Sequence, residues 1–322
     1  MSEFAWIDWL RVELATHEAR MRQAKHHMPW PPPDLERMLI APGDDAAVMR
    51  AGRGDLLLAA DMLMEGVHFD LRSTTPQMVG RKTLAVNLSD LAAMAGAPES
   101  ATICLALPKV GGAALAKALY SGLIPLAEEF GLTIAGGDTN AWDGPLVVSV
   151  AITGRAHPHG SVTRSGAAAG DWICVTGTLG GSLTGRHLSF RPRLQEAWQL
   201  HADYGLSAML DLSDGLAGDL RHILAASGVG AWLDPIGLPV SLEAQHLAKL
   251  DSAVDARHRA LTDGEDFELC FTLPAAAAQQ LLAAQPLPGV PISKIGEITA
   301  ATGLLWQGGE AVPDGGWLHR FT

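Results

Sequence analysis

The first fifteen residues carry apolar side chains at nearly helical spacing, which predicts an amphipathic helix over 1–15: Phe4, Ile7, Leu10 and Leu14. Residues 16–37 are polar and then rich in proline, and this pattern predicts a connector. We expect the histidines of this connector to be solvated rather than to bind a metal ion: His17, His26 and His27.

The rest of the first half alternates short apolar runs with amphipathic stretches, which is typical of α/β and α+β domains. Strands are expected at 55–61, 100–108, 132–138 and 146–154, and helices at 76–95 and 112–130. The second half repeats the mixture, with strands at 171–177, 208–213, 267–273 and 294–299 and helices at 214–227 and 275–284. Residues 154–170 are rich in Gly, Ala and Ser, so we place a boundary there between an N-terminal domain, 1–155, and a C-terminal α/β domain, 156–322.

Length, hydropathy and charge limit the class of protein. The chain has 322 residues, of which 48% are hydrophobic and 18% charged, which is enough for two domains that each bury a core. Lys and Arg total 23 against 35 Asp and Glu, and no basic block stands out, so a nucleic-acid partner is not expected. No apolar run is long enough to cross a membrane, and the N-terminus carries acids where a secretory signal carries bases. We therefore expect a cytoplasmic protein.

The three cysteines give no sign of cross-linking or metal binding. Cys104, Cys174 and Cys270 lie far apart inside apolar runs. Their number is odd and no pair has the spacing of metal ligands, so we expect buried free thiols.

Acidic residues gather in six short segments, mostly at the ends of apolar runs: GDDAAV (43–48), AADMLMEGVHFD (59–70), NLSDLAAM (87–94), GGDTN (136–140), DLSDGL (211–216) and DGEDFEL (263–269). Apolar runs end where loops leave a sheet, and binding sites are often assembled from such loops. Single segments also have a structural interpretation, with Asp214 as a helix N-cap and Asp219 as an acid in the first turns of that helix. The whole set, on a chain of net charge −12, predicts cations between the carboxylates, because like charges repel.

Seven segments, in this order, resemble the thiamine-monophosphate kinase family: GDDAAV, DMLMEGVHFD, KTLAVNLSDLAAMAGAP, GGDTN, TRSGAAAGDWICVTGTLG, LDLSDGLAGDL and DGEDFELCFT. The family lies in the superfamily of aminoimidazole ribonucleotide synthetase and selenophosphate synthetase, and the resemblance runs from about residue 39 to the C-terminal GGWLHRF. It implies a two-domain α/β (α+β) fold and a homodimer in which the N-terminal domains form a shared β-barrel. It also implies ATP in a cleft without a Walker loop, and the sequence indeed contains neither GxxxxGKS/T nor GxGxxG.

The resemblance also assigns roles to residues of this chain. The ligands of several Mg²⁺ ions would be Asp45, Asp61, Asp90, Asp138, Asp211 and Asp214. The contacts with ATP would be Tyr120, Gly137, Asp138, Arg164 and Ser213, and the contacts with thiamine monophosphate would be His68, Glu265 and Trp317. Catalysis itself would depend on Asp61, Asp90, Asp138 and Arg164. The residues alone leave other interpretations open, with Tyr120 and Trp317 as core or surface aromatics and His68 as a strand-end histidine.

The implied reaction is the ATP-dependent phosphorylation of thiamine monophosphate to thiamine diphosphate by direct transfer. The acceptor is already a phosphate monoester, so its oxygen is anionic near neutral pH and no general base is required. Metal ions and the fixed positive charge of Arg164 can then catalyse by aligning and neutralising the phosphates.

The chain departs from the family pattern in two motifs. Ala59 and Ala60 stand where the family has hydroxyl side chains, and Asp263 stands where it has glycine, which adds a negative charge near the substrate. The two alanines leave open a non-catalytic sensor of nucleotide or thiamine phosphate. Another ATP-dependent synthetase of the superfamily is the second alternative. A selenophosphate synthetase would have a reactive Cys in a Gly-rich N-terminal loop and a hydrogenase-maturation relative a C-terminal Cys, and the sequence has neither.

Overall fold

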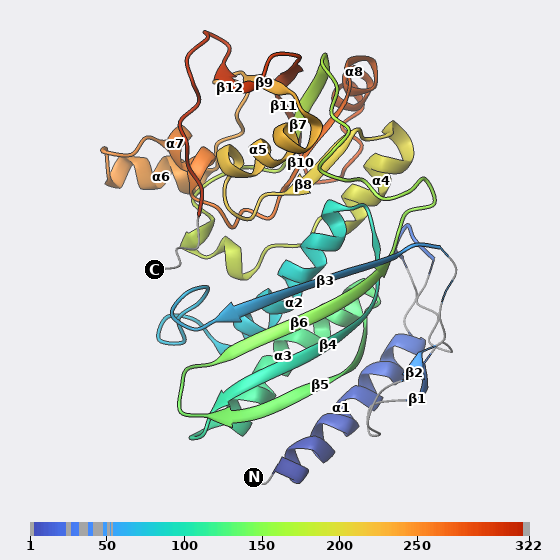
Figure 1. The fold of residues 1–322 in the computed structure, drawn as a ribbon. Helices are drawn as coiled ribbons and strands as arrows, with labels where there is room; N and C mark the ends of the chain where they lie inside the picture. Colours follow the sequence, from blue (N-terminus) through green and yellow to red (C-terminus); the bar gives the residue numbers. More distant parts are fainter. Residues whose placement is uncertain are drawn as a thin grey trace. The chain divides into compact units, whose positions relative to one another are not determined.

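The computed structural model describes residues 3–23, 27–31, 38–40, 48–49, 52 and 54–317 (Figure 1). The chain divides into two compact units. Unit 1 comprises Met1–Leu91 and Gly96–Ala156, and unit 2 comprises Ala92–Ala95 and His157–Thr322.

Unit 1 is built on a four-stranded sheet in the order β3-β6-β4-β5. Its strands are β3 (Leu56–Met64), β4 (Ala97–Pro108), β5 (Thr133–Trp142) and β6 (Val147–Arg155). β6 pairs antiparallel with β3 and β4, whereas β4 and β5 are parallel and are joined through α3 (Gly112–Phe130). Figure 1 shows α3 and α2 (Pro76–Ala93) against one face of this sheet. The other elements are α1 (Glu3–Gln23) and the antiparallel pair β1 (Met38–Ile40) and β2 (Val48–Met49).

The helices α2 and α3 cross with their backbones in contact. A Cβ atom on Gly80 would lie 2.0 Å from the carbonyl oxygen of Leu119, and one on Gly122 would lie 1.9 Å from that of Gln77. Real side chains do not fit at such distances, so the crossing requires glycine at both positions. The position of α2 beside the sheet is therefore fixed by close backbone packing.

The N-terminal helix is longer than the sequence predicted. α1 continues to Gln23, so the first part of the expected connector at 16–37 is helical. Its polar residues are good helix formers, and Arg22 forms an ion pair of 2.7 Å with Glu18 one turn earlier.

The connector histidines differ in their surroundings. His17 is buried rather than solvated, because α1 packs on α3 and places Nε2 of the ring 3.1 Å from the carbonyl oxygen of Leu132. His27 is exposed as expected, and His26 lies outside the described residues.

The sheet face opposite α2 and α3, which we call the open face, carries exposed apolar side chains along β3. It is formed by the even-numbered residues of β3 and their partners on β6 and β4, and Leu58 and Met62 are 73% and 55% exposed there. Cys104 is also exposed on this face, so the expectation of buried thiols is correct for Cys174 and Cys270 and wrong for Cys104. Exposed apolar side chains that are grouped in this way are typical of interaction surfaces.

Unit 2 is built on a six-stranded sheet in the order β12-β9-β11-β7-β10-β8. Its strands are β7 (Asp171–Thr176), β8 (Ala208–Asp211), β9 (Gly230–Leu233), β10 (Leu269–Pro274), β11 (Ile292–Thr299) and β12 (Gly303–Trp306). Its helices are α4 (Leu194–Tyr204), α5 (Leu216–Ser227), α6 (Leu242–Leu250), α7 (Ala256–Thr262) and α8 (Ala275–Ala284), with short 3-10 turns at Ser182–Thr184 and Arg186–Leu188. The buried stripe of α5 joins apolar residues of the sheet in one core: Leu216, Leu220, Ile223 and Leu224.

Candidate functional site

Three loops of unit 2 meet beyond the end of β8. The N–H group of Glu265 donates to the carbonyl oxygen of Ser213 over 2.6 Å. The N–H group of Trp317 donates to the carbonyl oxygen of Asp214 over 2.9 Å. The fold therefore brings together four residues that the sequence assigned to metal, nucleotide and substrate, from segments far apart in the chain.

Asp219 holds the first of these loops from inside. Its Oδ2 atom accepts hydrogen bonds from the N–H groups of Asp214 at 3.0 Å and Gly215 at 3.1 Å, which confirms its structural role. The N-cap interpretation of Asp214 is wrong, because α5 begins after Gly215 and no side chain caps it. Burial raises the pKa of Asp219 to about 7, and the charges of Asp211 and Asp214 add to this, although the N–H donors act in the opposite direction.

Replacing Asp219 with Asn should change the dependence of stability on pH. An acid whose pKa rises on folding contributes stability that is fully present below 3.8 and is lost as the pH rises through about 7. Asn does not ionise, and its amide oxygen can still accept both N–H groups. Between about pH 4 and about pH 8, the free energy of unfolding should therefore fall less in the variant than in the natural protein. The difference between the two falls should be up to about 4 kcal/mol. Urea denaturation at both pH values, without divalent cations, measures this, and equal falls in both proteins would contradict it.

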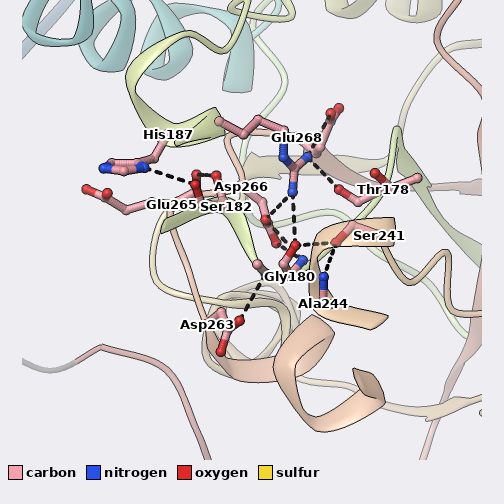
Figure 2. Close-up of polar contacts among 12 residues, drawn as sticks. Thr178, Gly180, Ser182, His187, Ser241, Ala244, Asp263, Glu265, Asp266 and Glu268 are labelled. Carbon is pink, nitrogen blue, oxygen red and sulfur yellow. Dashed lines mark hydrogen bonds and ion pairs between the residues drawn. The ribbon is translucent and has the colours of Figure 1, made fainter. Parts of the chain in front are cut away.

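Glu265 lies in a strained loop. Its φ angle is 52° and that of Phe267 is 50°, in the left-handed region that residues other than glycine rarely adopt. Glu265 is held on both sides of its peptide. Its N–H group donates to the carbonyl oxygen of Ser213. Its carbonyl oxygen accepts the hydroxyl of Ser182 at 2.6 Å, which Figure 2 shows. Strain of this kind persists where the surrounding structure fixes it, which is common in binding sites.

Acids of the DGEDFEL segment fix the Gly-rich loop, residues 177–185, that contains Ser182 (Figure 2). Asp266 accepts the N–H group of Gly180 at 2.9 and 3.1 Å and pairs with Arg186 at 2.8 Å. Burial raises the pKa of Asp266 to about 7, against the lowering effects of Gly180 and Arg186. Asp263 accepts the N–H group of Gly181 at 2.9 Å, a structural role that the sequence did not suggest.

Glu268, the last acid of the DGEDFEL segment, forms a buried ion pair close to the Gly-rich loop. Arg193 donates to its two carboxylate oxygens at 2.6 and 2.8 Å, and the hydroxyl of Thr176 donates at 2.7 Å. Sequence reasoning missed Arg186 and Arg193. The only signal for them is the density of acids in DGEDFEL, because buried carboxylates require donors nearby.

Arg164 is not part of this meeting of loops. Its carbonyl oxygen accepts the hydroxyl of Ser227, the last residue of α5, at 3.3 Å, whereas Ser213 and Asp214 precede the first turn of that helix. The 12 residues of α5 separate the two ends by about 17 Å. Arg164 is exposed at its own end.

In unit 1, a hydrogen bond joins Asp61 of β3 to α2, the helix that carries Asp90. The N–H group of Asp61 donates to Oδ1 of Asn87 at 3.1 Å. Asn87 is fully buried and is itself held by a hydrogen bond of 2.9 Å to the carbonyl oxygen of Thr83. Asp90 follows Asn87 by three residues and so lies on the same face of α2.

Asp138 lies at the other edge of the sheet. Three strand spacings, about 14 Å along the sheet, separate β5 from β3. The faces also differ, because Asp61 is on the side of the helices whereas Asp138 pairs with Cys104 on the open face. Within one unit 1, Asp138 therefore cannot share an ion with Asp61. Gly137 has a packing reason of its own, since a Cβ atom there would lie 1.8 Å from the carbonyl oxygen of Ile103.

The remaining predicted residues of unit 1 differ in exposure. His68 follows β3 in a turn, where its Nδ1 accepts the N–H group of Met64 at 3.1 Å and its carbonyl oxygen accepts the buried ammonium of Lys82 at 2.8 Å. Tyr120 is 2% exposed on the buried face of α3, and burial raises its pKa. This position favours the interpretation of Tyr120 as a core aromatic over that of an ATP contact.

Among the described residues, no group of three or more His, Cys, Asp or Glu side chains is placed to hold a metal ion. Asp45, one of the predicted ligands, lies outside them. In the same part of the chain, no helix is both long and apolar enough to cross a membrane.

Comparison with known proteins covers most of the chain. The family model for AIR synthase related protein, N-terminal domain, matches residues 43–156. The thiamine-monophosphate kinase of Rhodopirellula baltica is 37% identical over 281 residues, which cover 85% of this chain and 87% of that protein. The thiamine-monophosphate kinase of Escherichia coli K12 is 39% identical over 280 residues, with coverages of 80% and 83%.

Solved structures agree with these relatives. The crystal structure of thiamine-monophosphate kinase from Stenotrophomonas maltophilia has a TM-score of 0.78 and 34% identity, and the match covers 92% of this chain and 96% of that one. AaThiL complexed with AMPPCP and TMP has a TM-score of 0.74 and 30% identity, with coverages of 86% and 91%. The hydrogenase maturation protein HypE of Escherichia coli, at 23% identity and a TM-score of 0.65, covers 78% of this chain and 82% of its own and shares the fold.

Proposed function

Because the chain belongs to the thiamine-monophosphate kinase family, as its motifs predicted, we propose that it transfers a phosphoryl group from ATP to thiamine monophosphate. The product is thiamine diphosphate. The observation that carries the proposal is the hydrogen bond of 2.6 Å between Glu265 and Ser213, which ties the segment assigned to substrate to the segment assigned to ATP. AaThiL supports it as a relative that binds both TMP and AMPPCP, an ATP analogue.

Magnesium fits the acids of unit 1, because Mg²⁺ is bound through carboxylate oxygens together with phosphates and water. We assign Asp61 and Asp90 to one ion, because the N–H group of Asp61 bonds to Asn87 and Asp90 follows Asn87 by about one turn of α2. Asp138 is assigned to a separate ion of the group, and Asp211 and Asp214 to ions that accompany the nucleotide. When bound, Mg²⁺ would neutralise and align the phosphate oxygens.

The substrate contacts follow from the chemistry of the side chains. The indole of Trp317 is 56% exposed and offers a flat apolar face on which an aromatic ring can stack. The carboxylate of Glu265 complements the positive charge of the thiazolium ring. Ser213 and the always charged Arg164 are assigned to ATP. None of these residues acts as a general base, because the acceptor oxygen is already anionic.

Incubating the purified protein with ATP, Mg²⁺ and thiamine monophosphate tests the proposal. We expect thiamine diphosphate and ADP in equal amounts, and no product from free thiamine. Binding of nucleotide without product would favour the sensor, and product from free thiamine would show that the acceptor is wrong.

Ala59 and Ala60 should leave the kinase active, with at most a higher requirement for free Mg²⁺. A lost hydroxyl ligand is replaced by water, and Mg²⁺ normally keeps several waters. The register places Ala59 on the face of Asp61 and Ala60 on the open face. A Mg²⁺ titration compares the natural protein with an Ala59→Ser, Ala60→Thr double variant. An inactive natural protein whose activity the double variant restores would overturn this expectation.

We also propose that unit 1 forms a homodimer through the open face. Leu58 and Met62 are exposed on that face, and β3 and β5 are edge strands, so that closing two sheets together would cover both features. The natural protein should therefore have the mass of a dimer at micromolar concentration by light scattering. Met62→Asp should give a monomer, because it would bury an unpaired charge.

The matched control for this experiment is Ile236→Asp in unit 2. Ile236 is 89% exposed and lies outside the open face, so its variant should keep the mass of the natural protein. A monomeric natural protein would refute the dimer.

A further inference from the structure

Residues 312–317, which we call the C-terminal strap, lie across the first turns of α5 and bring Trp317 to the loop that follows β8. Val312 anchors one end of the strap, because its side chain is 2% exposed and its N–H group donates to the carbonyl oxygen of Leu304 at 3.1 Å. At the other end, the N–H group of Trp317 donates to the carbonyl oxygen of Asp214. Trp317 therefore reaches the predicted substrate site only while the residues between these two ends keep their conformation.

Two glycines allow the middle of the strap to lie directly on α5 and α7. A Cβ atom on Gly218 of α5 would lie 3.0 Å from the carbonyl oxygen of Gly315, and one on Gly315 would lie 2.3 Å from Cγ2 of Thr262 at the end of α7. Gly316 has a φ angle of 115°, which residues with a side chain rarely adopt. Glycine loses more conformational freedom on folding than any other residue, so an ordered strap needs contacts with the rest of unit 2.

Arg221 of α5 supplies such contacts. Its Nη1 atom donates to the carbonyl oxygen of Ala217 in the same helix, which orients the guanidinium group. Its Nη2 atom donates to the carbonyl oxygens of Val312 at 3.0 Å and Pro313 at 3.5 Å, and it lies 2.9 Å from Oδ1 of Asp314. Asp314 is 97% exposed, so this ion pair contributes little and the contacts with the two carbonyl groups hold the strap.

We propose that Arg221 is a positioning residue of the kinase, which holds the C-terminal strap so that Trp317 can stack on thiamine monophosphate. The inference rests on the proposed function, in which Trp317 contacts that substrate. Arg221 lies in the second turn of α5 and is assigned no contact with either substrate. Without it the strap would have to be ordered when the substrate binds, and the cost of ordering a segment lowers the affinity.

Steady-state kinetics of four proteins test this role: the natural protein, Arg221→Met, Trp317→Ala and the double variant. Methionine keeps an apolar stem and removes the donors. We expect Arg221→Met to raise the KM for thiamine monophosphate about five- to tenfold, with kcat and the KM for ATP unchanged. In the Trp317→Ala background the same change should alter that KM less than about twofold, because the effects of two residues that act through one contact do not add.

Arg221→Lys should give an intermediate KM, because an ammonium group keeps the charge but lacks the planar fork that reaches carbonyl groups of both the helix and the strap. This variant also takes the place of Arg221→Met, in both backgrounds, if the methionine variant does not fold.

Hydrogen exchange of the peptide that contains residues 312–317, followed by mass spectrometry, gives a readout that does not depend on turnover. Arg221→Met should speed exchange in the strap and leave exchange in β7 and β10 unchanged. Unchanged exchange in the strap would overturn the inference. Faster exchange throughout unit 2 would also overturn it, because it would show a general loss of stability.

The control is Arg257→Met, which removes an exposed arginine of α7 and should alter no parameter. If Arg221→Met raises the KM for thiamine monophosphate by the same factor with and without Trp317, or in neither background, Arg221 does not act through Trp317 and the inference alone is overturned. An unchanged KM in Trp317→Ala would overturn it as well. If the natural protein makes no thiamine diphosphate, the proposed function fails and the inference fails with it.

Discussion

Replacing Asp61 or Asp90 with Asn should lower kcat at least about a hundredfold at saturating ATP and thiamine monophosphate. Each change keeps the size of the side chain and removes a negative charge that holds Mg²⁺. Charge neutralisation by a bound metal contributes several kcal/mol, and about 2.7 kcal/mol corresponds to a hundredfold in rate. The fold should survive in the Asp61 variant, because the contact with Asn87 is made by the main-chain N–H group. Initial rates over a Mg²⁺ titration, with thermal melting as a check on folding, measure the effect.

Asp143→Asn is the matched control, because it removes an acid of unit 1 that is 83% exposed and pairs only with exposed Lys109 among the contacts described. Its kcat should stay within about twofold of the natural value, since exposed ion pairs contribute little. Full activity in both the Asp61 and Asp90 variants would refute the assignment of the metal site.

Arg193→Met should destabilise unit 2 by about 3–5 kcal/mol, because the buried carboxylate of Glu268 loses its hydrogen-bonded cation and keeps only Arg186, at 3.9 Å. Glu268 is 4% exposed and accepts from both Arg193 and Thr176. Adding Glu268→Gln to the Arg193 variant removes the unpaired charge and should recover a large part of the loss. Urea denaturation of the two single variants and the double variant measures the free energies of unfolding.

Arg72→Met provides the comparison for the ion-pair prediction. Arg72 pairs with Asp70 at 2.5 Å, but its side chain is 90% exposed, so its removal should hardly change the free energy of unfolding. A loss in Arg193→Met as small as that in Arg72→Met would show that the buried pair does not support the Gly-rich loop.

Helices with clear local signals could be predicted closely from the sequence. α3 has the expected bounds, and it ends at Gly131 in the left-handed conformation that glycine favours. α8 also has the expected bounds and begins directly after Pro274. β9 and β12 were not foreseen, because each has four residues and owes its stability to pairing with a distant part of the chain.

The meeting of Ser213, Glu265 and Trp317 was implied by the resemblance of their motifs to the kinase family, and the structure shows how backbone hydrogen bonds produce it. The support below these residues could not be predicted, because Arg186 and Asp266 are 80 positions apart and neither alone has a signature. The side of the sheet on which Asp138 lies could not be predicted either. It depends on a register shift between Ala101 and Thr102, and a slip of one residue moves a side chain to the other face.

The crossing of α2 and α3 through Gly80 and Gly122 affects how inherited variation in this protein should be interpreted. Neither glycine touches a ligand in the proposal, yet even alanine would push the two backbones apart and displace the helix that carries Asp90. A survey scored only by cell growth without thiamine would therefore class both glycines with the acids that hold the metal. Measuring the amount of folded protein in each cell separates the two groups. The glycine variants should have less folded protein, whereas the aspartate variants should have a lower turnover per molecule.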